Sequence, residues 1–301
     1  MEGVRITFSN LIIMNFVSSC FNLQDGVIRW CIQRGLIAKE RLCKKCSRPM
    51  RLIQRSDRND GVQWCCSEIS HVCRYSIRQK SWFAGSRLTI GDILKITYLW
   101  VKKCSGAFIG EELHLSKHTV VDWRSFCREV CVKDCIDNGD VLGGVGSVVE
   151  IVEAKLAIRK FGRVKPVTGG WVYGGIERGS NKCFFQVVPK TTKRVFLNVL
   201  KKYVLPGTTV ISDCFRSYDC LSDELFISLS VKHKMNFKDR EDTKNVEGTW
   251  SSIKRYFRGT NKCKDGFDSH MFEYMWRRRW SDENDLFIKF LEAVRRVYNP
   301  E

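Results

Sequence analysis

The sequence predicts a mixed α/β protein, in which a mixed β-sheet flanked by helices follows a cysteine-rich ribbon and a small helical segment. Three patterns support this fold class: paired cysteines between positions 43 and 73, apolar positions at helical spacing between 89 and 130, and strand-like runs from 148 onward. Of the 301 residues, 44% are hydrophobic and 28% are charged, which is typical of folded globular domains.

The chain is strongly basic, with 51 Lys and Arg against 33 Asp and Glu and a net charge of +18. This balance predicts a polyanionic partner, DNA or RNA, rather than a membrane. The apolar stretch at 11–17 is broken by Asn15 and is shorter than the roughly 20 residues of a membrane-spanning helix. No signal-peptide cleavage site follows it, so we expect a protein that is not secreted, nuclear in a eukaryote and otherwise cytoplasmic.

Residues 1–40 form the predicted N-terminal helical segment, with a helix at 25–36 and no function assigned. The chain has 15 cysteines, an odd number spread along a long basic sequence. This distribution favours a reducing compartment and metal ligands over a disulfide framework.

Residues 41–80 have the pattern of a zinc ribbon, in which two short hairpins each supply a pair of thiolates to a structural zinc ion. The preferred zinc ligands are Cys43, Cys46, Cys66 and Cys73. Cys65 adjoins Cys66, so only one of the two can face the metal from an extended strand, and His71 is an alternative fourth ligand. The simpler interpretation is a set of free buried cysteines.

Residues 86–140 are predicted to be a helical DNA-binding segment. Thr89 begins one helix as its cap, and a second helix starts after Ser116, with glycines between them. The arrangement is typical of a helix-turn-helix, in which the second helix enters the major groove, although any small helical bundle gives similar stripes. Lys117 and Arg124 lie outside the apolar stripe of the second helix, and we expect them to contact DNA.

Residues 146–280 contain the predicted core, and 281–301 a C-terminal helix. Strands are expected at 148–154, 171–177 and 183–188, then a helix at 192–203 and a strand at 208–213. Three antiparallel strands followed by a helix and a further strand match a ribonuclease-H-like architecture.

Two carboxylates of this core are suited to holding a divalent metal against phosphate. Asp213 ends a buried strand, where ligand sites of open α/β sheets lie, although it could instead cap a helix at Ser217. Glu247 opens a helix at 246–258 and lies in its positive first turn. Lys254 and Arg258 follow on the same helix and could meet the phosphate backbone of DNA.

Five sequence blocks resemble the Merlin superfamily of transposases and its bacterial insertion-sequence relatives over roughly residues 40–280. The blocks are WVYGGIERG (171–179), GTTVISD (207–213), NF (236–237), TKNVEGTWS (243–251) and WRRR (276–279). The resemblance implies a DDE transposase, in which two aspartates and a glutamate hold Mg²⁺ or Mn²⁺ for hydrolysis at transposon ends and strand transfer. It also implies double-stranded transposon ends as substrate and a dimer or larger assembly. Asp213 and Glu247 occupy the second and third catalytic positions.

The first catalytic position falls on Val152, where the family pattern has the leading aspartate. In a two-metal site the ions lie about 3.5–4 Å apart, and a bridging carboxylate offsets their repulsion, which an isopropyl group cannot do. Glu150 shares the strand face of Val152 but lies about 6.6 Å away along the strand, and Glu153 points to the opposite face unless a bulge brings it round.

The leading hypothesis is therefore a transposon-encoded DNA-binding protein with impaired strand cleavage and transfer. One alternative is an active transposase in which Glu150 or Glu153 completes the site. Another is a host-recruited DNA-binding protein that retains only the ribbon and the helical segment for recognition.

Overall fold

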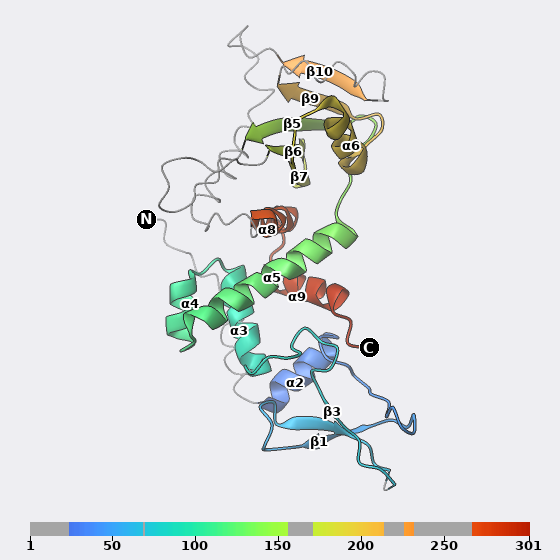
Figure 1. Ribbon diagram of the computed structural model, residues 1–301, viewed down its shortest axis with the longest axis vertical. Helices are drawn as coiled ribbons and strands as arrows, with labels where there is room; N and C mark the ends of the chain where they lie inside the picture. The colour runs from blue at the N-terminus through green and yellow to red at the C-terminus, as the bar shows by residue number, and fades with distance from the viewer. Residues whose placement is uncertain (1–23, 69, 156–170, 214–225, 232–266) are drawn as a thin grey trace. The chain divides into compact units, whose positions relative to one another are not determined.

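The computed structural model describes residues 24–68, 70–155, 171–213, 226–231 and 267–301 (Figure 1). The chain divides into two compact units, one comprising Met1–Val130 with Asp285–Glu301 and the other Cys131–Asn284. Glu247, Lys254, Arg258 and the helix expected at Ser217 lie outside the described residues.

The ribbon of the first unit is a three-stranded antiparallel sheet. Its strands are β1 (Arg51–Gln54), β2 (Val62–Cys65) and β3 (Arg74–Ser76), with β2 in the centre. Before the ribbon, α2 (Gln24–Gln33) contacts the helical segment. The sheet is too small to bury a core of its own, so the fold of this region depends on what holds its loops together.

Helices α3 (Ile90–Val101), α4 (Gly106–Glu112), α5 (Lys117–Asn138) and α9 (Leu286–Val297) follow. The Thr89 hydroxyl accepts from the Asp92 backbone N–H, which confirms the predicted cap. The glycines expected in a turn, Gly106 and Gly110, instead lie within α4, whose cap is Ser105.

An aromatic core joins these helices to the segment after the ribbon. The Trp82 ring lies 5.2 Å from Trp123 of α5 and 6.0 Å from Phe290 of α9, and Phe290 also meets Trp100 of α3. Edge-to-face contacts of this kind add to the free energy gained by burying large rings. The C-terminal helix therefore belongs to the first unit, although it follows the sheet domain in sequence.

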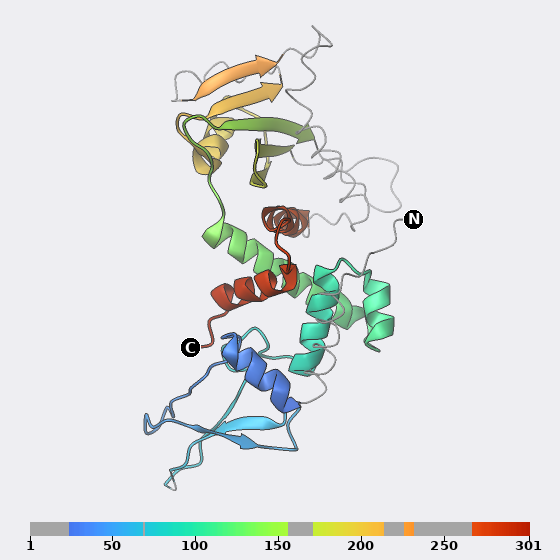
Figure 2. The same ribbon diagram turned by 180° about the vertical axis from the view of Figure 1, so that it is seen from behind.

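The second unit is built on a five-stranded mixed sheet with the order β10-β9-β5-β6-β7, visible across the sheet in Figures 1 and 2. Its strands are β5 (Val148–Lys155), β6 (Trp171–Glu177), β7 (Cys183–Val188), β9 (Thr209–Asp213) and β10 (Ile227–Val231). Strands β5, β6 and β7 are antiparallel to their neighbours in this set, β9 is parallel to β5, and β10 is parallel to β9. This strand order is ribonuclease-H-like, which confirms the predicted fold class.

Helices cover the sheet on both faces. On one face, Phe184 of β7 stacks on Tyr203 of α6 (Lys193–Tyr203), with ring centroids 4.7 Å apart. On the other, Phe185 meets Tyr274 of α8 (Phe267–Arg279). Neighbouring strand residues point to opposite faces, so these two contacts assign one helix to each face. A short parallel pair, β4 (Leu142–Gly143) and β8 (Val204–Leu205), lies beside this sheet.

Candidate functional site

The backbone brings the first two predicted catalytic positions together. Strands β5 and β9 are adjacent and parallel, with Ile151 level with Ser212. Val152 and Asp213 are the next residues of these two strands, so they occupy equivalent positions at the carboxyl end of β9. Carboxylates that follow adjacent parallel strands in this way share one edge of the sheet, which is where open α/β sheets bind ligands.

Glu150, an alternative source of the missing carboxylate, is buried and ion-paired. It is 2% exposed, and its Oε1 accepts from Arg178 Nε at 2.5 Å. A buried carboxylate in such contact is neutralised by its partner, and breaking the pair leaves an uncompensated charge. Glu150, which lies two residues before Val152, is therefore already paired with Arg178.

Glu153, the other alternative, lies on the α6 side of the sheet. It is directly opposite Tyr173 of β6, whose ring contacts Phe196 of α6. Burial raises the pKa of Glu153. Hydrogen bonds from Thr191 and Tyr173 lower this pKa, but burial has the larger effect. Burial, with the Glu153 charge, also raises the pKa of Tyr173 to about 12. Glu153 thus forms part of a hydrogen-bonded group beneath α6.

The ribbon brings together a candidate metal site made of three cysteines and one histidine. Cys43, Cys46, Cys66 and His71 each offer one ligand atom, and the four atoms all lie within 4.8 Å of one another. Cys46 and Cys66 sulfurs are 3.6 Å apart, and Cys43 Sγ is 3.3 Å from His71 Nε2. A tetrahedral zinc ion separates sulfur and nitrogen ligands by about 3.5–3.8 Å, so the donor set fits a structural zinc ion.

The electrostatics around Cys43 favour the thiolate that a metal needs. Burial opposes ionisation of this thiol, but hydrogen bonds from the Lys45 and Cys46 backbone and from His71 outweigh it and lower the pKa to about 6. The loop Cys43–Cys46 therefore presents its first sulfur in a form suited to coordination.

The fourth ligand in this cluster is His71 in place of Cys73. The Cys73 thiol donates instead to the Tyr75 hydroxyl at 3.2 Å, and that hydroxyl also accepts from the Lys44 backbone. Cys65, as expected from its position next to Cys66, is not in the cluster. The structure therefore brings His71, the alternative fourth ligand, to the three cysteine sulfurs.

The two predicted DNA contacts of the helical segment differ in their surroundings. Lys117 is exposed at the start of α5. Arg124 is half-buried and lies over α4, because a Cβ added to Gly106 would be 2.9 Å from Arg124 Nη1. Arg124 therefore packs between the two helices, and Gly106 is small enough to admit it.

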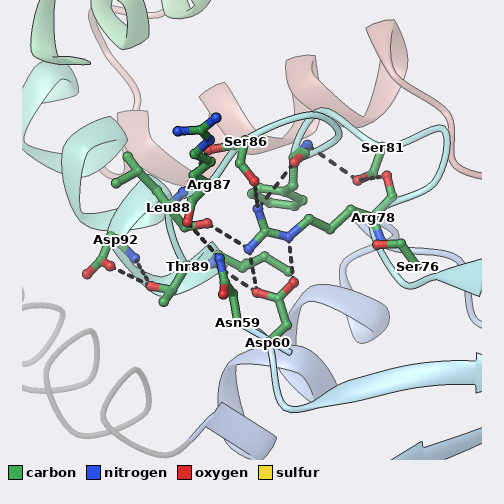
Figure 3. Close-up of polar contacts among 12 residues, drawn as sticks. Asn59, Asp60, Ser76, Arg78, Ser81, Ser86, Arg87, Leu88, Thr89 and Asp92 are labelled. Atoms are coloured by element: carbon green, nitrogen blue, oxygen red, sulfur yellow. Dashed lines mark hydrogen bonds and ion pairs between the residues drawn. The ribbon is translucent and has the colours of Figure 1, made fainter. Parts of the chain in front are cut away.

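A buried ion pair that the sequence patterns do not predict joins the ribbon to α3 (Figure 3). Arg78 donates to both oxygens of Asp60, at 2.5 and 2.6 Å, and to the Ser86 and Leu88 carbonyls that lead into α3. Asn59 adds a bond from its side-chain amide to the Arg87 carbonyl at 2.8 Å. In the sequence, only the many charged residues of the ribbon indicate such a pair, because Asp60 and Arg78 are 18 residues apart.

The WRRR block has a structural role in the second unit. Trp276 Nε1 donates to Asp134 at 3.1 Å, and Arg279 pairs with Asp140 at 3.0 Å. Arg277 pairs with Glu273 within α8, and both side chains are buried. These bonds hold α8 against the end of α5, so they position the helix that covers one face of the sheet.

Sequence comparisons match part of the chain to transposase-like proteins. The ISXO2-like transposase domain matches residues 153–280. An uncharacterized transposase-like protein of Haemophilus influenzae is 30% identical over 98 residues, which are 32% of this chain and 80% of that protein. The chain therefore belongs to a transposase-like family.

Two solved structures are also similar to the chain. The catalytic core domain of BIV integrase is 10% identical, over 49% of this chain and 80% of that one, with a TM-score of 0.27. The Mos1 strand transfer complex is 11% identical, over 68% and 75%, also with a TM-score of 0.27. Both scores are low, and the fold assignment rests on the strand order. Among the described helices, none has the length and hydropathy needed to cross a membrane.

Proposed function

We propose that the chain is a DNA-binding, transposase-like protein of a DNA transposon, placed in the Merlin superfamily, whose strand cleavage and transfer are impaired. The observation that carries this proposal is the valine at position 152, which directly follows Ile151, the residue level with Ser212 beside Asp213. The family's chemistry needs a carboxylate there, and valine offers no oxygen to a metal ion.

The neighbouring acids support impairment over rescue. Glu150 is held by Arg178 in a buried pair, and freeing it would leave the guanidinium without its partner. Glu153 is hydrogen-bonded on the α6 side with Tyr173 and Thr191. Turning it to the other face would need a shift of the strand by one residue, which would also turn over the buried Val149 and Ile151.

Divalent ions, when bound, would activate water and stabilise the charge that develops on phosphate. The residues present do not fit a complete two-ion site, because only Asp213 and Glu247 remain of the three acids. We therefore assign them to a single weakened Mg²⁺ or Mn²⁺ site. Cys43, Cys46, Cys66 and His71 would hold zinc, which closes the ribbon and has no part in cleavage.

DNA binding is expected to survive the loss of cleavage. Contacts between Lys or Arg and phosphate depend on the positive charge of the chain, +18 overall, and an aspartate replaced by valine makes the site less repulsive to DNA. On the same grounds we assign Lys117, Lys254 and Arg258 to contacts with the phosphate backbone of DNA. Arg124 instead packs between α4 and α5. Assembly as a dimer or larger on paired ends, and a nuclear location in a eukaryotic host, belong to the same proposal.

The proposal is tested by restoring the acid. Val152→Asp should cut a duplex carrying the inverted repeats that flank the gene, in Mg²⁺ or Mn²⁺, at least about tenfold faster than the parent chain. Val152→Asn is the matched control, since it has the size of aspartate without the charge, and it should stay inactive. Cutting by the parent chain at the rate of Val152→Asp would overturn the assignment of Val152.

A further inference from the structure

The ribbon has an excess of positive charge that its own acids cannot offset. Residues 41–88 contain eleven Lys and Arg but only three acids. Each acid is paired with an arginine: Asp57 with Arg55 at 2.7 Å, Asp60 with Arg78 at 2.5 Å, and Glu68 with Arg48. Arg58 also contacts Asp57, and the half-buried Arg41 donates to the Gln79 carbonyl. Arg51 and Arg74 are exposed, and all three acids of the ribbon are already paired with other arginines.

Two of these cations flank one face of the ribbon sheet. Arg51 of β1 and Arg74 of β3 are both directly opposite Cys65 of β2, so the three residues form one row across the sheet. The two outer strands are about 10 Å apart. Both arginines are exposed, and neither guanidinium has a hydrogen-bond or ion-pair partner in the part of the chain that the structure describes.

An open groove adjoins Arg74. Its volume is about 680 Å³, and its walls come from the β1–β2 turn, from β2 and β3 and from the loop before α3. The wall is polar, with Arg58, Asn59, Gln63 and Ser86 among its residues. Part of it is the region around Asp60 and Arg78 shown in Figure 3. A polar groove beside exposed arginines suits a charged, hydrated ligand better than an apolar one.

The aromatic residues of the sheet decide which nucleic acid fits. Trp64 and Tyr75 alternate with Cys65 and Arg74 along their strands, so they project from the opposite face. Single-stranded nucleic acid is held by stacking its bases on aromatic rings, whereas duplex phosphates need only the cations. The row of Arg51, Cys65 and Arg74 presents no aromatic ring, and Tyr75, which also lines the groove, has its hydroxyl engaged by Cys73 and Lys44.

We infer that the Arg51–Arg74 face of the ribbon, with its adjoining groove, is a docking surface for the phosphate backbone of duplex DNA. The inference rests on the proposed DNA-binding function and assigns a contact that is separate from the helical segment. Its bonds are to phosphate, so this surface adds affinity and fixes the position of the ribbon without reading sequence.

The test compares charge removal at two places in the full chain. Binding to a mixed-sequence 40-base-pair duplex is measured by fluorescence anisotropy over a range of salt concentrations for Arg51→Gln/Arg74→Gln. The control, Lys193→Gln/Arg194→Gln, removes the same charge from two exposed residues of α6. Zinc content and circular dichroism show whether each variant has folded.

The ribbon variant should lower the slope of log affinity against log salt by about two, and weaken duplex binding about tenfold, while the control leaves both near the parent values. Equal behaviour of the two variants would overturn the inference. A larger loss on single-stranded DNA of the same length would overturn the duplex assignment. Failure of the parent chain to bind any duplex would reject the proposed function itself, which separates the two conclusions.

Discussion

At the residue level, the candidate metal site is defined by what surrounds Val152. The register pairs Ile151 with Ser212 on adjacent parallel strands, and Val152 and Asp213 directly follow them, where two acids of a metal site would be expected to meet. Glu150 and Glu153, which are nearest in sequence, are each engaged elsewhere, one with Arg178 and the other with Tyr173. We therefore expect neither acid to replace the missing carboxylate.

The environment of Glu153 predicts a pH-dependent stability. Burial raises its folded pKa above the unfolded value of about 4.5, so its ionised form costs free energy once the pH exceeds that value. Glu153→Gln removes this cost while the amide oxygen can still accept from Tyr173. We expect a modestly higher Tm than the parent chain at pH 7 and no gain below about pH 4. Thermal unfolding followed at both pH values checks this, and a lower Tm at pH 7 would contradict it.

At the scale of elements, the sequence predicts most of what local patterns determine. Strands β5, β6 and β7 and the Thr89 cap lie where alternation and capping residues place them. Two glycines suggested a turn at α4, but a capping serine and packing against α5 hold them in a helix. The choice between His71 and Cys73 depends on how a loop folds back on the first two cysteines, which spacing along the chain does not determine.

The two ligand sets of the ribbon make opposite predictions. His71→Ala should lose the zinc ion or bind it at least tenfold more weakly, because it removes a nitrogen that lies 3.3 Å from Cys43 Sγ. Cys73→Ala should keep one zinc per chain, because its thiol bonds to Tyr75. Metal stoichiometry by mass spectrometry, with X-ray absorption to count sulfur neighbours, separates the two. Retention of zinc in His71→Ala with loss in Cys73→Ala would restore the all-cysteine site.

The buried pair of Asp60 and Arg78 makes the ribbon and α3 mutually dependent. Arg78→Met leaves a buried carboxylate and two carbonyls without their donor, and we expect it to lower the free energy of unfolding by about 3–5 kcal/mol. The double variant Asp60→Asn/Arg78→Met removes both charges and should lower the free energy of unfolding by less than Arg78→Met alone. Denaturant unfolding of both variants provides the measurement, and equal destabilisation by single and double changes would show that the charge pairing is unimportant.

At the scale of the whole molecule, two compact units combine different functions. The first contains the candidate zinc site, the arginine face of the ribbon and the helical segment, and the second contains the ribonuclease-H-like sheet. The sequence could not predict that the last helix, α9, belongs to the first unit, because its aromatic partners are about 190 to 210 residues earlier in the chain. Under the proposed function, the first unit contributes contacts to DNA and the second contains the site of strand chemistry.

We propose that this chain holds DNA that it does not cut. The most direct test incubates the parent chain with labelled duplex carrying the flanking inverted repeats, in Mn²⁺, at protein concentrations that saturate binding, and measures bound and nicked fractions in the same sample. We expect nearly complete binding with nicking no higher than for Asp213→Asn, in which a second acid is removed. Nicking by the parent chain that is abolished in Asp213→Asn would contradict the claim.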